Sequence, residues 1–410
     1  MPPERKNTHP PFIYIACPWT PKGGGMFKVA DYLIQSQDPR RPGSHDGHSP
    51  PQAQLRPLDT RGSGSAAGSL LVLAGALARL LQGRLQGQLA GVHVNMAERL
   101  SLVRKSAVVL SCRALGVPVV LHVHAAQLHS FYRALPRLAR ALTRWVFGLA
   151  DCCVVLGETS RRFVTEELGV PAARVRVLIN GVPAAAVPRR IPGRMQHVLF
   201  VGNLSARKGV PELLAALALP GWDADHTRVS LLGGGNLAAY RQQAHALGLS
   251  DWVHFEGWAC QARVSELMAQ ADVLVLPSHD EGLPLVILEA LSHGLAVVCT
   301  PVGEIADYLK DGQHALFVPP GQAPALAAQL QRLLADAGLR ERLERQGQAL
   351  YEAQFSMRHF FEGVARLHQE VFGVCAVMRR TAPATSVTSP SALTPGGART
   401  TAPAAQELMS

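Results

Sequence analysis

Charged residues are scarce in this chain of 410 residues: Asp, Glu, Lys and Arg make up 17% of it, whereas 48% of the residues are hydrophobic. This balance excludes disorder over the whole chain and suits parallel sheets that are buried between helices. Cysteine is also rare. The seven cysteines include no pair at CxxC spacing, so the sequence favours buried, reduced thiols over a disulfide framework or a cysteine metal site.

Long hydrophobic runs and a leader segment are lacking as well. The longest apolar stretch, Ser69–Leu81, is interrupted by Arg79 and falls short of the roughly 20 residues that span a bilayer. The start MPPERKNTHP leads directly into a short apolar segment and does not have the form of a secretory signal. We therefore expect a cytoplasmic protein, either soluble or peripheral on the inner face of the membrane.

Acidic residues are outnumbered by basic ones, and the formal net charge is +10. Such an excess favours anionic partners, among them phosphate-bearing ligands, acidic lipids and nucleic acid. Nucleic acid is the least favoured of these, because the sequence has no basic module rich in aromatic residues.

Apolar strands alternate with amphipathic helices, which is typical of an α/β protein with parallel sheets. The strands form two series, because 183–195 lack hydrophobic periodicity and carry several prolines. We predict two Rossmann-like domains that face each other across a cleft. The predicted boundaries are 1–187 and 188–355 for the domains, 356–378 for a closing helix that packs back toward the first domain, and 379–410 for a disordered, low-complexity tail.

Residues 38–66 are rich in Pro, Gly and Ser and predict only a long loop or an irregular strand. The expected strands elsewhere are 12–17, 91–94, 117–124, 151–156, 174–182, 197–202, 228–234, 251–257, 271–277, 295–300 and 314–319. The expected helices include 98–115, 133–149, 322–337 and 356–372.

The segment EGLPLVILEALSHGLAVV (281–298) follows an apolar strand and a polar turn. Pro284 suits the first turn of a helix, and Gly294 lies where that helix would stop. Ligands bind at the carboxyl ends of strands in such sheets, and a helix start offers N–H groups and a positive dipole end to a phosphate. Glu281 is then placed near a sugar and Glu289 near a ribose diol, although two glutamates alone are more often solvated surface residues.

This segment resembles the E-x7-E signature of family 4 glycosyltransferases, which are retaining enzymes of the two-domain GT-B fold. The match includes both glutamates, the EGxP turn, the EA pair and the following Gly-x-x-Val-Val, and the resemblance extends over about residues 12–370. It implies a metal-independent hexosyltransferase without a cofactor. Such an enzyme moves a sugar from a nucleotide-diphosphate sugar, bound by the second domain, to a saccharide or lipid-linked acceptor on the side of the first, in surface polysaccharide or glycan assembly. The residues implied here are Glu281 in catalysis and Gly282, Leu283, Pro284, Leu285, Val286 and Glu289 at the donor.

A second strand–loop–helix junction lies in VGNLSARKGVPELL, which starts at Val201. Lys208 precedes the expected helix, where its ammonium can pair with a diphosphate. The family commonly has Gly-Arg-Leu-Ser-x-x-Lys-Gly here, so the resemblance implies that Lys208 binds the donor and acts in catalysis. Asn203 stands where the family has arginine, and Arg207 is the candidate replacement. A solvated loop lysine is the alternative for Lys208.

The first half offers weaker signals. The resemblance implies a contact of Gly24 and Gly25 with the donor phosphate, although a plain structural turn explains them nearly as well. It also implies a sugar contact for His124 at the end of an expected strand, with His122 as the fallback and a structural histidine as the alternative. HVNMAERLSLVRKS resembles the acceptor-side segment of the family, and a surface helix explains it almost as well. The candidates in it are Ser101, Arg104 and Lys105.

Four arginines recur in 133–149 at spacings that align them on one helical face. They are Arg133, Arg137, Arg140 and Arg144. Pro136 indicates that the regular helix starts only there, so Arg133 is expected at its margin. The face suits an anionic membrane surface as well as it suits the solvated side of a packed helix.

Two other functions stay open for the whole chain. Some nucleotide-sugar epimerases share the two-domain architecture, and the missing arginine at Asn203 suits a catalytically inactive nucleotide-binding scaffold. The sequence leaves the base, the sugar and the acceptor undefined.

Overall fold

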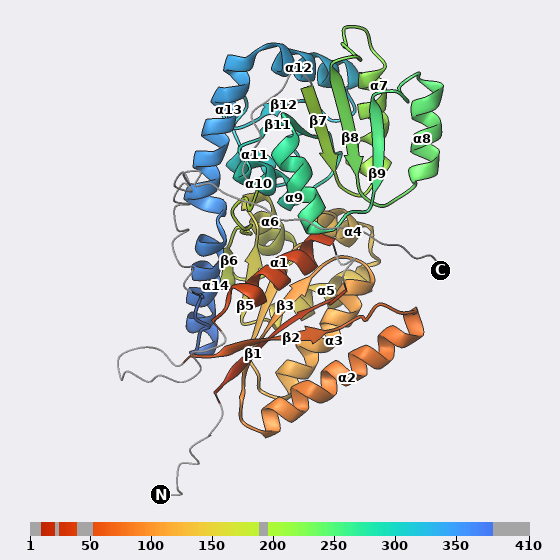
Figure 1. Cartoon of the computed structure of the whole chain (residues 1–410). Coiled ribbons are helices and arrows are strands. Elements are labelled where there is room, and N and C mark those ends of the chain that lie inside the picture. The colour runs from red at the N-terminus through yellow and green to blue at the C-terminus, as the bar shows by residue number, and fades with distance from the viewer. Residues whose placement is uncertain (1–9, 21–23, 39–51, 188–195, 380–410) are drawn as a thin grey trace, which may run out of the picture. The chain divides into compact units, whose positions relative to one another are not determined.

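The computed structural model describes residues 10–20, 24–38, 52–187 and 196–379. Most of the expected linker and the tail from residue 380 onward lie outside the described residues. Figure 1 shows two parallel sheets with helices packed on their faces. The α/β class with two Rossmann-like halves is therefore confirmed.

The first sheet has six parallel strands in the order β2-β1-β3-β4-β5-β6. They are β1 (Phe12–Cys17), β2 (Gln54–Asp59), β3 (Leu89–Met96), β4 (Val119–Val123), β5 (Cys152–Val155) and β6 (Val175–Val177). β2 is a regular strand in the stretch for which the sequence predicts a loop or an irregular strand. Its Pro57 is tolerated because β2 lies at the edge of the sheet and pairs only with β1.

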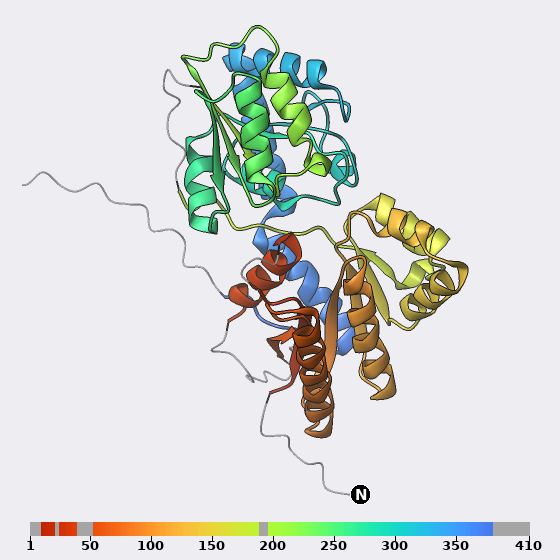
Figure 2. The same cartoon turned by 90° about the vertical axis from the view of Figure 1, so that its right-hand side faces the viewer.

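Helices from the same half cover this sheet. They are α1 (Gly24–Ser36), α2 (Ala66–Leu85), α3 (Leu100–Ala114), α4 (Leu128–Ala134), α5 (Arg137–Gly148) and α6 (Glu158–Arg162). α2 packs against α3, and α3 packs against α5, along one face of the sheet (Figures 1 and 2). The single helix expected at 133–149 is divided into α4 and α5, because Pro136 interrupts the hydrogen bonds of a continuous helix.

α2 extends beyond both ends of the apolar stretch Ser69–Leu81. It has 20 residues, and Ala67–Leu85 is long and apolar enough to cross a membrane by length and composition. The expectation that the apolar stretch is too short to span a bilayer is therefore wrong. One such helix is nevertheless weak evidence for a membrane span. Ala76 and Leu80 are buried on its inner side, and only 22% of the segment is buried. The outer side of α2 is therefore exposed to solvent.

The second sheet also has six parallel strands, in the order β12-β11-β10-β7-β8-β9. They are β7 (Gln196–Val201), β8 (Thr227–Leu232), β9 (Val253–Gly257), β10 (Val273–Leu276), β11 (Ala296–Cys299) and β12 (Leu316–Phe317). The helices of this half are α7 (Val210–Leu217), α8 (Leu237–Ala246), α9 (Gln261–Gln270), α10 (Leu285–Ser292), α11 (Ile305–Tyr308), α12 (Ala323–Ala335) and α13 (Ala337–Leu350). Every strand that the sequence predicts in this half is present.

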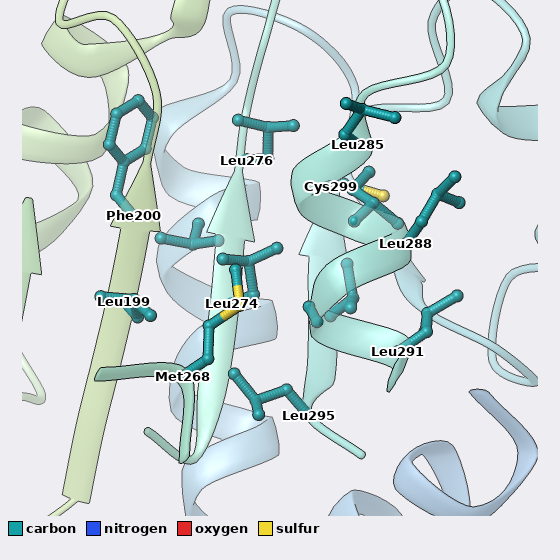
Figure 3. Packing of buried hydrophobic residues seen from close by; sticks show 14 of the residues in the cluster. Leu199, Phe200, Met268, Leu274, Leu276, Leu285, Leu288, Leu291, Leu295 and Cys299 are labelled. Atoms are coloured by element: carbon teal, nitrogen blue, oxygen red, sulfur yellow. The ribbon is translucent and has the colours of Figure 1, made fainter. Parts of the chain in front are cut away.

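α10 is buried on nearly all sides. Figure 3 shows Leu288 and Leu291 of α10 in one apolar cluster with Leu274 of β10 and Cys299 of β11. All four side chains are fully buried. A helix packed in this way cannot shift without opening a cavity, so its first turn is held firmly at the ends of the strands.

α14 (Met357–Phe372) follows the second sheet in the chain but packs against the first. Leu367 on α14 shares a small apolar cluster with Val120 of β4 and Val154 of β5. A Cβ atom at Gly91 of β3 would collide with the Phe372 ring, so glycine permits the close approach of the helix. The last described helix thus belongs to the core of the first half.

Candidate active site

One cavity of 1090 Å³ is lined by residues from both halves of the described chain. Its size suits a ligand somewhat larger than a drug-like molecule, because such sites commonly measure about 300 to 1000 Å³. The sequence-predicted residues that line it are Gly24, Gly25, His124, Asn203, Arg207, Lys208, Glu281, Gly282, Leu283, Pro284, Leu285, Val286 and Glu289. The structure therefore brings every predicted donor-side residue to one place.

The Lys208 ammonium and the Glu281 carboxylate form an ion pair in this cavity. The Ser278 hydroxyl donates to the same carboxylate oxygen over 2.7 Å. The side chains of Lys208 and Glu281 are only 12% and 6% exposed. Charges withdrawn this far from water need a partner, so the pairing holds both groups at the cavity wall.

The turn that carries Lys208 depends on Gly209. The φ angle of Gly209 is +71°, and a Cβ atom there would collide with the carbonyl of Pro277, so only glycine fits. The turn also orients Arg207, whose guanidinium donates to the carbonyl oxygen of Asp280 over 2.6 Å. Two cations of one short turn thus reach the same cavity.

α10 begins at Leu285, with Pro284 as its N-cap residue. The sequence predicts proline in the first turn, but its ψ angle of 123° is extended, so it lies one position earlier. The loop before it is fixed by the Glu304 N–H, which donates to the Gly282 carbonyl over 3.1 Å. Leu285 and Val286 line the cavity, and the start of a helix favours an anion.

Glu289 has partners that the sequence does not predict. Lys28 Nζ lies 2.7 Å from Glu289 Oε1, the Tyr32 hydroxyl donates to the same oxygen over 3.2 Å, and Gln261 donates over 3.3 Å. Burial, and then the Glu289 carboxylate, raise the pKa of Tyr32, so its hydroxyl remains a donor. Lys28 and Tyr32 are one turn apart on α1. Their spacing directly after the glycine turn is the signal that could have identified them.

His124 lies after β4, and its Nε2 is 2.7 Å from Asn95 Oδ1. Burial, with smaller contributions from His93 and Lys105, lowers the pKa of His124 to about 3. A neutral imidazole ring has one N–H group. In His124 this group is at Nε2 and donates a hydrogen bond to the amide oxygen of Asn95, so Nδ1 keeps its lone pair. The ring of the fallback residue, His122, is centred 4.0 Å from that of His124 and does not line the cavity. His124 is thus an uncharged group at the cavity.

The predicted acceptor-side residues Ser101, Arg104 and Lys105 do not line this cavity. Lys105 is fully buried and donates to Thr60 Oγ1 over 2.7 Å, and burial lowers its pKa to about 7. The Ser101 hydroxyl accepts from the Ala97 N–H over 3.3 Å at the start of α3. Their role toward an acceptor stays a prediction.

The four arginines do not share one helix. Arg133 lies in the last turn of α4, where its guanidinium donates to both carboxylate oxygens of Glu167 over 3.1 and 2.6 Å. Arg133 therefore lies outside the helix that carries the other three, as Pro136 predicts, and the alignment on one face does not extend to it. Those on α5 are Arg137, Arg140 and Arg144.

Two carboxylates of the second half reach the start of α6 in the first. Glu304 Oε1 accepts from the Ser160 N–H over 2.9 Å and from its hydroxyl, and Asp307 accepts from the Glu158 N–H over 2.9 Å. A Cβ atom at Gly157 would collide with both carboxylates. Burial, and then hydrogen bonding with Asp307, raise the pKa of Glu304 to about 7. This contact between the halves therefore titrates near neutral pH.

Through Glu304, the free energy of unfolding should fall as the pH rises from about 4.5 to 7. The folded chain holds the proton up to about pH 7, whereas an ordinary glutamate releases it near 4.5, so the folded state binds more protons in this window. Glu304→Gln keeps an acceptor for Ser160 and does not titrate. Between these pH values its stability relative to wild type should rise by on the order of 2 kcal/mol, measured by urea titration. The exposed Glu341→Gln is the control, and a pH-independent difference for Glu304→Gln would contradict the prediction.

Two family models match consecutive parts of the chain. The model described as "Glycosyl transferase 4-like domain" matches residues 29–181, and the model described as "Glycosyl transferases group 1" matches residues 186–350. The chain belongs to glycosyltransferase family 4. The cavity of this glycosyltransferase is lined by residues from both matched segments.

Named relatives agree with this assignment. Alpha-D-kanosaminyltransferase of Streptomyces kanamyceticus is 28% identical over 284 residues, which are 64% of this chain and 73% of the relative. The lipopolysaccharide core biosynthesis glycosyltransferase LpsE of Rhizobium meliloti is 35% identical over 170 residues, 40% of this chain and 47% of the relative, so the match spans about half of that protein. The structure of Anabaena HepE with UDP and glucose superposes with a TM-score of 0.66 at 19% identity, over 88% of this chain and 99% of the other, which shows the GT-B fold. Neither relative is an epimerase by name.

Cys260 is the one cysteine among the described residues that line the cavity. All seven cysteines are free thiols, and five are buried, as the sequence predicts. No group of three or more His, Cys, Asp or Glu side chains among the described residues is arranged to hold a metal ion. Metal independence stays a prediction.

Proposed function

We propose that this glycosyltransferase moves a sugar, with retention of configuration, from a nucleotide-diphosphate donor to a saccharide or lipid-linked acceptor in surface polysaccharide or glycan assembly. The observation that carries the proposal is the meeting of Lys208, Glu281 and the start of α10 at one cavity. An ammonium and a helix start converge where a departing diphosphate gains negative charge. The UDP held by Anabaena HepE supports a nucleotide donor, and the name of LpsE supports a polysaccharide product.

In the proposed complex, Lys208 and the first N–H groups of α10 bind the diphosphate, Glu281 holds the transferred sugar and Glu289 the ribose. Asn203 lacks the charge of the arginine usual in the family, and Lys28 and Arg207 are further cations on the cavity wall. We propose that these cations stabilise the leaving group without a metal ion or a cofactor. Because the single N–H of the neutral His124 ring is donated to Asn95, the ring would accept a hydrogen bond from a sugar hydroxyl at Nδ1.

A thermal-shift screen with UDP-, GDP- and ADP-glucose tests the donor. A donor at about 100 times its Kd stabilises the folded state by about 2.7 kcal/mol, which raises the Tm by about 3 °C or more. One of the three should produce this shift, and Lys208→Ala should reduce it. Transfer of the sugar to an added acceptor, measured as release of the nucleoside diphosphate, distinguishes an active enzyme from an inactive scaffold. A shift without turnover of any donor would favour the scaffold, and isomerisation of the donor would favour the epimerase.

We also propose that the protein acts in the cytoplasm, at the inner face of an anionic membrane, through α5. Three apolar side chains of this helix are exposed beside its arginines: Leu138, Leu142 and Trp145, at 83%, 56% and 53%. Basic, amphipathic helices bind anionic lipid, and each cation near the surface contributes about 1 kcal/mol. Arg133 is left out of this proposal because it is paired with Glu167.

A further inference from the structure

The outer side of α2 is an apolar stripe. Leu71, Ala74, Ala78, Leu81 and Leu85 follow one another at spacings of three and four, and all are exposed. The exposed fraction is 77% for Leu71 and 78% for Leu85. A helix on the surface of a globular protein normally turns polar residues outward. These five residues, called the α2 stripe below, therefore lack the partner that their composition requires.

The inner side of α2 is tied to the core of the first half. Leu80 is fully buried in one apolar cluster with Phe12 of β1 and Leu89 of β3. A Cβ atom at Gly83 would come within 2.9 Å of the Phe12 ring, so the helix lies close to the sheet. Crossing a bilayer would remove these contacts from the core. The geometry therefore suits a helix that lies flat on a surface.

The sequence around α2 is strongly basic. From Arg61 to Ala150 the sequence contains eleven Lys and Arg residues and a single acidic residue, Glu98. Arg79 and Arg84 are exposed and lie on opposite sides of the stripe, as the helical period of 3.6 residues requires. An apolar band between cations matches the layered chemistry of an anionic bilayer, with acyl chains below phosphate groups.

The neighbouring helices continue the same surface. α3 exposes Val103 by 65% and Leu110 by 37%, and α5 exposes Leu138 and Trp145. α3 packs between α2 and α5, and the three helices share one face of the first sheet (Figures 1 and 2). Exposed apolar side chains and an excess of basic residues thus occur together on one helical layer.

We infer that the α2 stripe is a membrane-docking surface, which inserts its leucines at the acyl boundary of an anionic bilayer while Arg79 and Arg84 contact headgroup phosphates. It extends the membrane contact proposed for α5 and rests on that proposal for the sign of the lipid charge. Apolar residues at spacings of three and four also suit pairing with another helix, so the alternative partner is α2 of a second copy of the chain. Two copies paired through α2 would bring Arg79 and Arg84 together with no acidic residue on the helix, so the charge favours the lipid.

Vesicle flotation of the full chain tests the inference. The wild-type protein should float with vesicles of phosphatidylcholine and phosphatidylglycerol at 7:3, and much less with phosphatidylcholine alone. The triple variant Leu71→Gln, Leu81→Gln, Leu85→Gln should float at least tenfold less, because its polar side chains no longer enter the acyl region. The matched control Leu219→Gln, Leu247→Gln replaces exposed leucines of the second half and should float like wild type. Melting curves show that each variant is folded.

The variant Arg137→Gln, Arg140→Gln, Arg144→Gln distinguishes the contribution of α2 to vesicle binding from that of α5. It should weaken the preference for phosphatidylglycerol while the α2 leucines still support residual binding. Wild-type flotation by the α2 triple variant would overturn the inference. So would a lipid-free dimer, measured by light scattering, that the triple variant converts to a monomer, because the stripe would then belong to a second copy. Absence of flotation by the wild-type protein would overturn both membrane proposals and leave sugar transfer untouched.

Discussion

Replacing Lys208 with alanine should lower kcat/KM for sugar transfer by about 100- to 1000-fold, because the ammonium opposes the charge that grows on the departing diphosphate. Its ion pair with Glu281 holds it at the cavity together with the start of α10. Release of the nucleoside diphosphate, with the donor found by thermal shift, measures the loss. Arg207→Ala is the neighbouring control: its guanidinium is engaged with a carbonyl oxygen, so we expect a smaller loss.

The double variant Lys208→Ala, Glu281→Gln distinguishes catalysis from folding. The single Lys208→Ala variant leaves a carboxylate of 6% exposure without its cation, which should cost about 3 kcal/mol of stability. Glu281→Gln removes that carboxylate charge, so the double variant should recover much of the stability but none of the activity. Recovery of both together would mean that Lys208 serves only to hold the fold.

The strands of the second sheet were predictable because a parallel sheet buried on both faces gives short, continuous apolar runs between turns. β2 was not, because it lies at an edge, contains Pro57 and is therefore less apolar. α2 was underestimated for a related reason. Gln82, Gly83 and Arg84 follow the apolar stretch in the sequence and look like its end, yet the helix continues to Leu85.

The donor side of the site was predictable because its residues lie in two short motifs, each at the junction of a strand and a helix. Lys28 and Tyr32 were missed because their contact with Glu289 joins positions more than 250 residues apart. Such a contact depends on how the two halves meet. The local pattern after the glycine turn indicates only that Lys28 and Tyr32 share one face of a helix, and not that Glu289 lies opposite them. The same limit applies to Glu304 and Ser160, whose hydrogen bonds also join the two halves.

A row of three histidine rings joins α14 to the first sheet. His93 Nδ1 lies 2.8 Å from His368 Nε2, and His93 Nε2 lies 3.1 Å from His122 Nδ1. Burial lowers the pKa of His93 to about 3 and the pKa values of His122 and His368 well below their ordinary range. All three rings are therefore neutral at pH 7. Since a neutral ring has one N–H, His93 donates to one neighbour and accepts from the other, which couples the three tautomers.

The free energy of unfolding should therefore fall steeply as the pH drops from about 6.5 toward 3. Unfolded histidines take up protons below about pH 6.5, whereas His93 does so only near pH 3 and burial holds the pKa of His122 and His368 well below 6.5. The unfolded state therefore binds more protons as the pH drops below 6.5. Each ring then lowers the free energy of unfolding by about 1.4 kcal/mol per pH unit, so the three rings together lower it by about 4 kcal/mol per pH unit. A total stability of about 5 to 15 kcal/mol would be lost within a few pH units.

His368→Phe isolates this effect, because it removes one titrating ring while an aromatic side chain still fills the space. Urea titrations at several pH values below 6.5 should give a slope of unfolding free energy against pH that is smaller by about 1.4 kcal/mol per unit than in wild type. His245→Gln, which removes an exposed histidine on α8, should leave the slope unchanged. The slope depends on the difference in bound protons between the unfolded and folded states and not on the contacts that the variant loses. The comparison therefore holds even where the variant is less stable at every pH. Equal slopes in all three proteins would show that the row takes up its protons without unfolding.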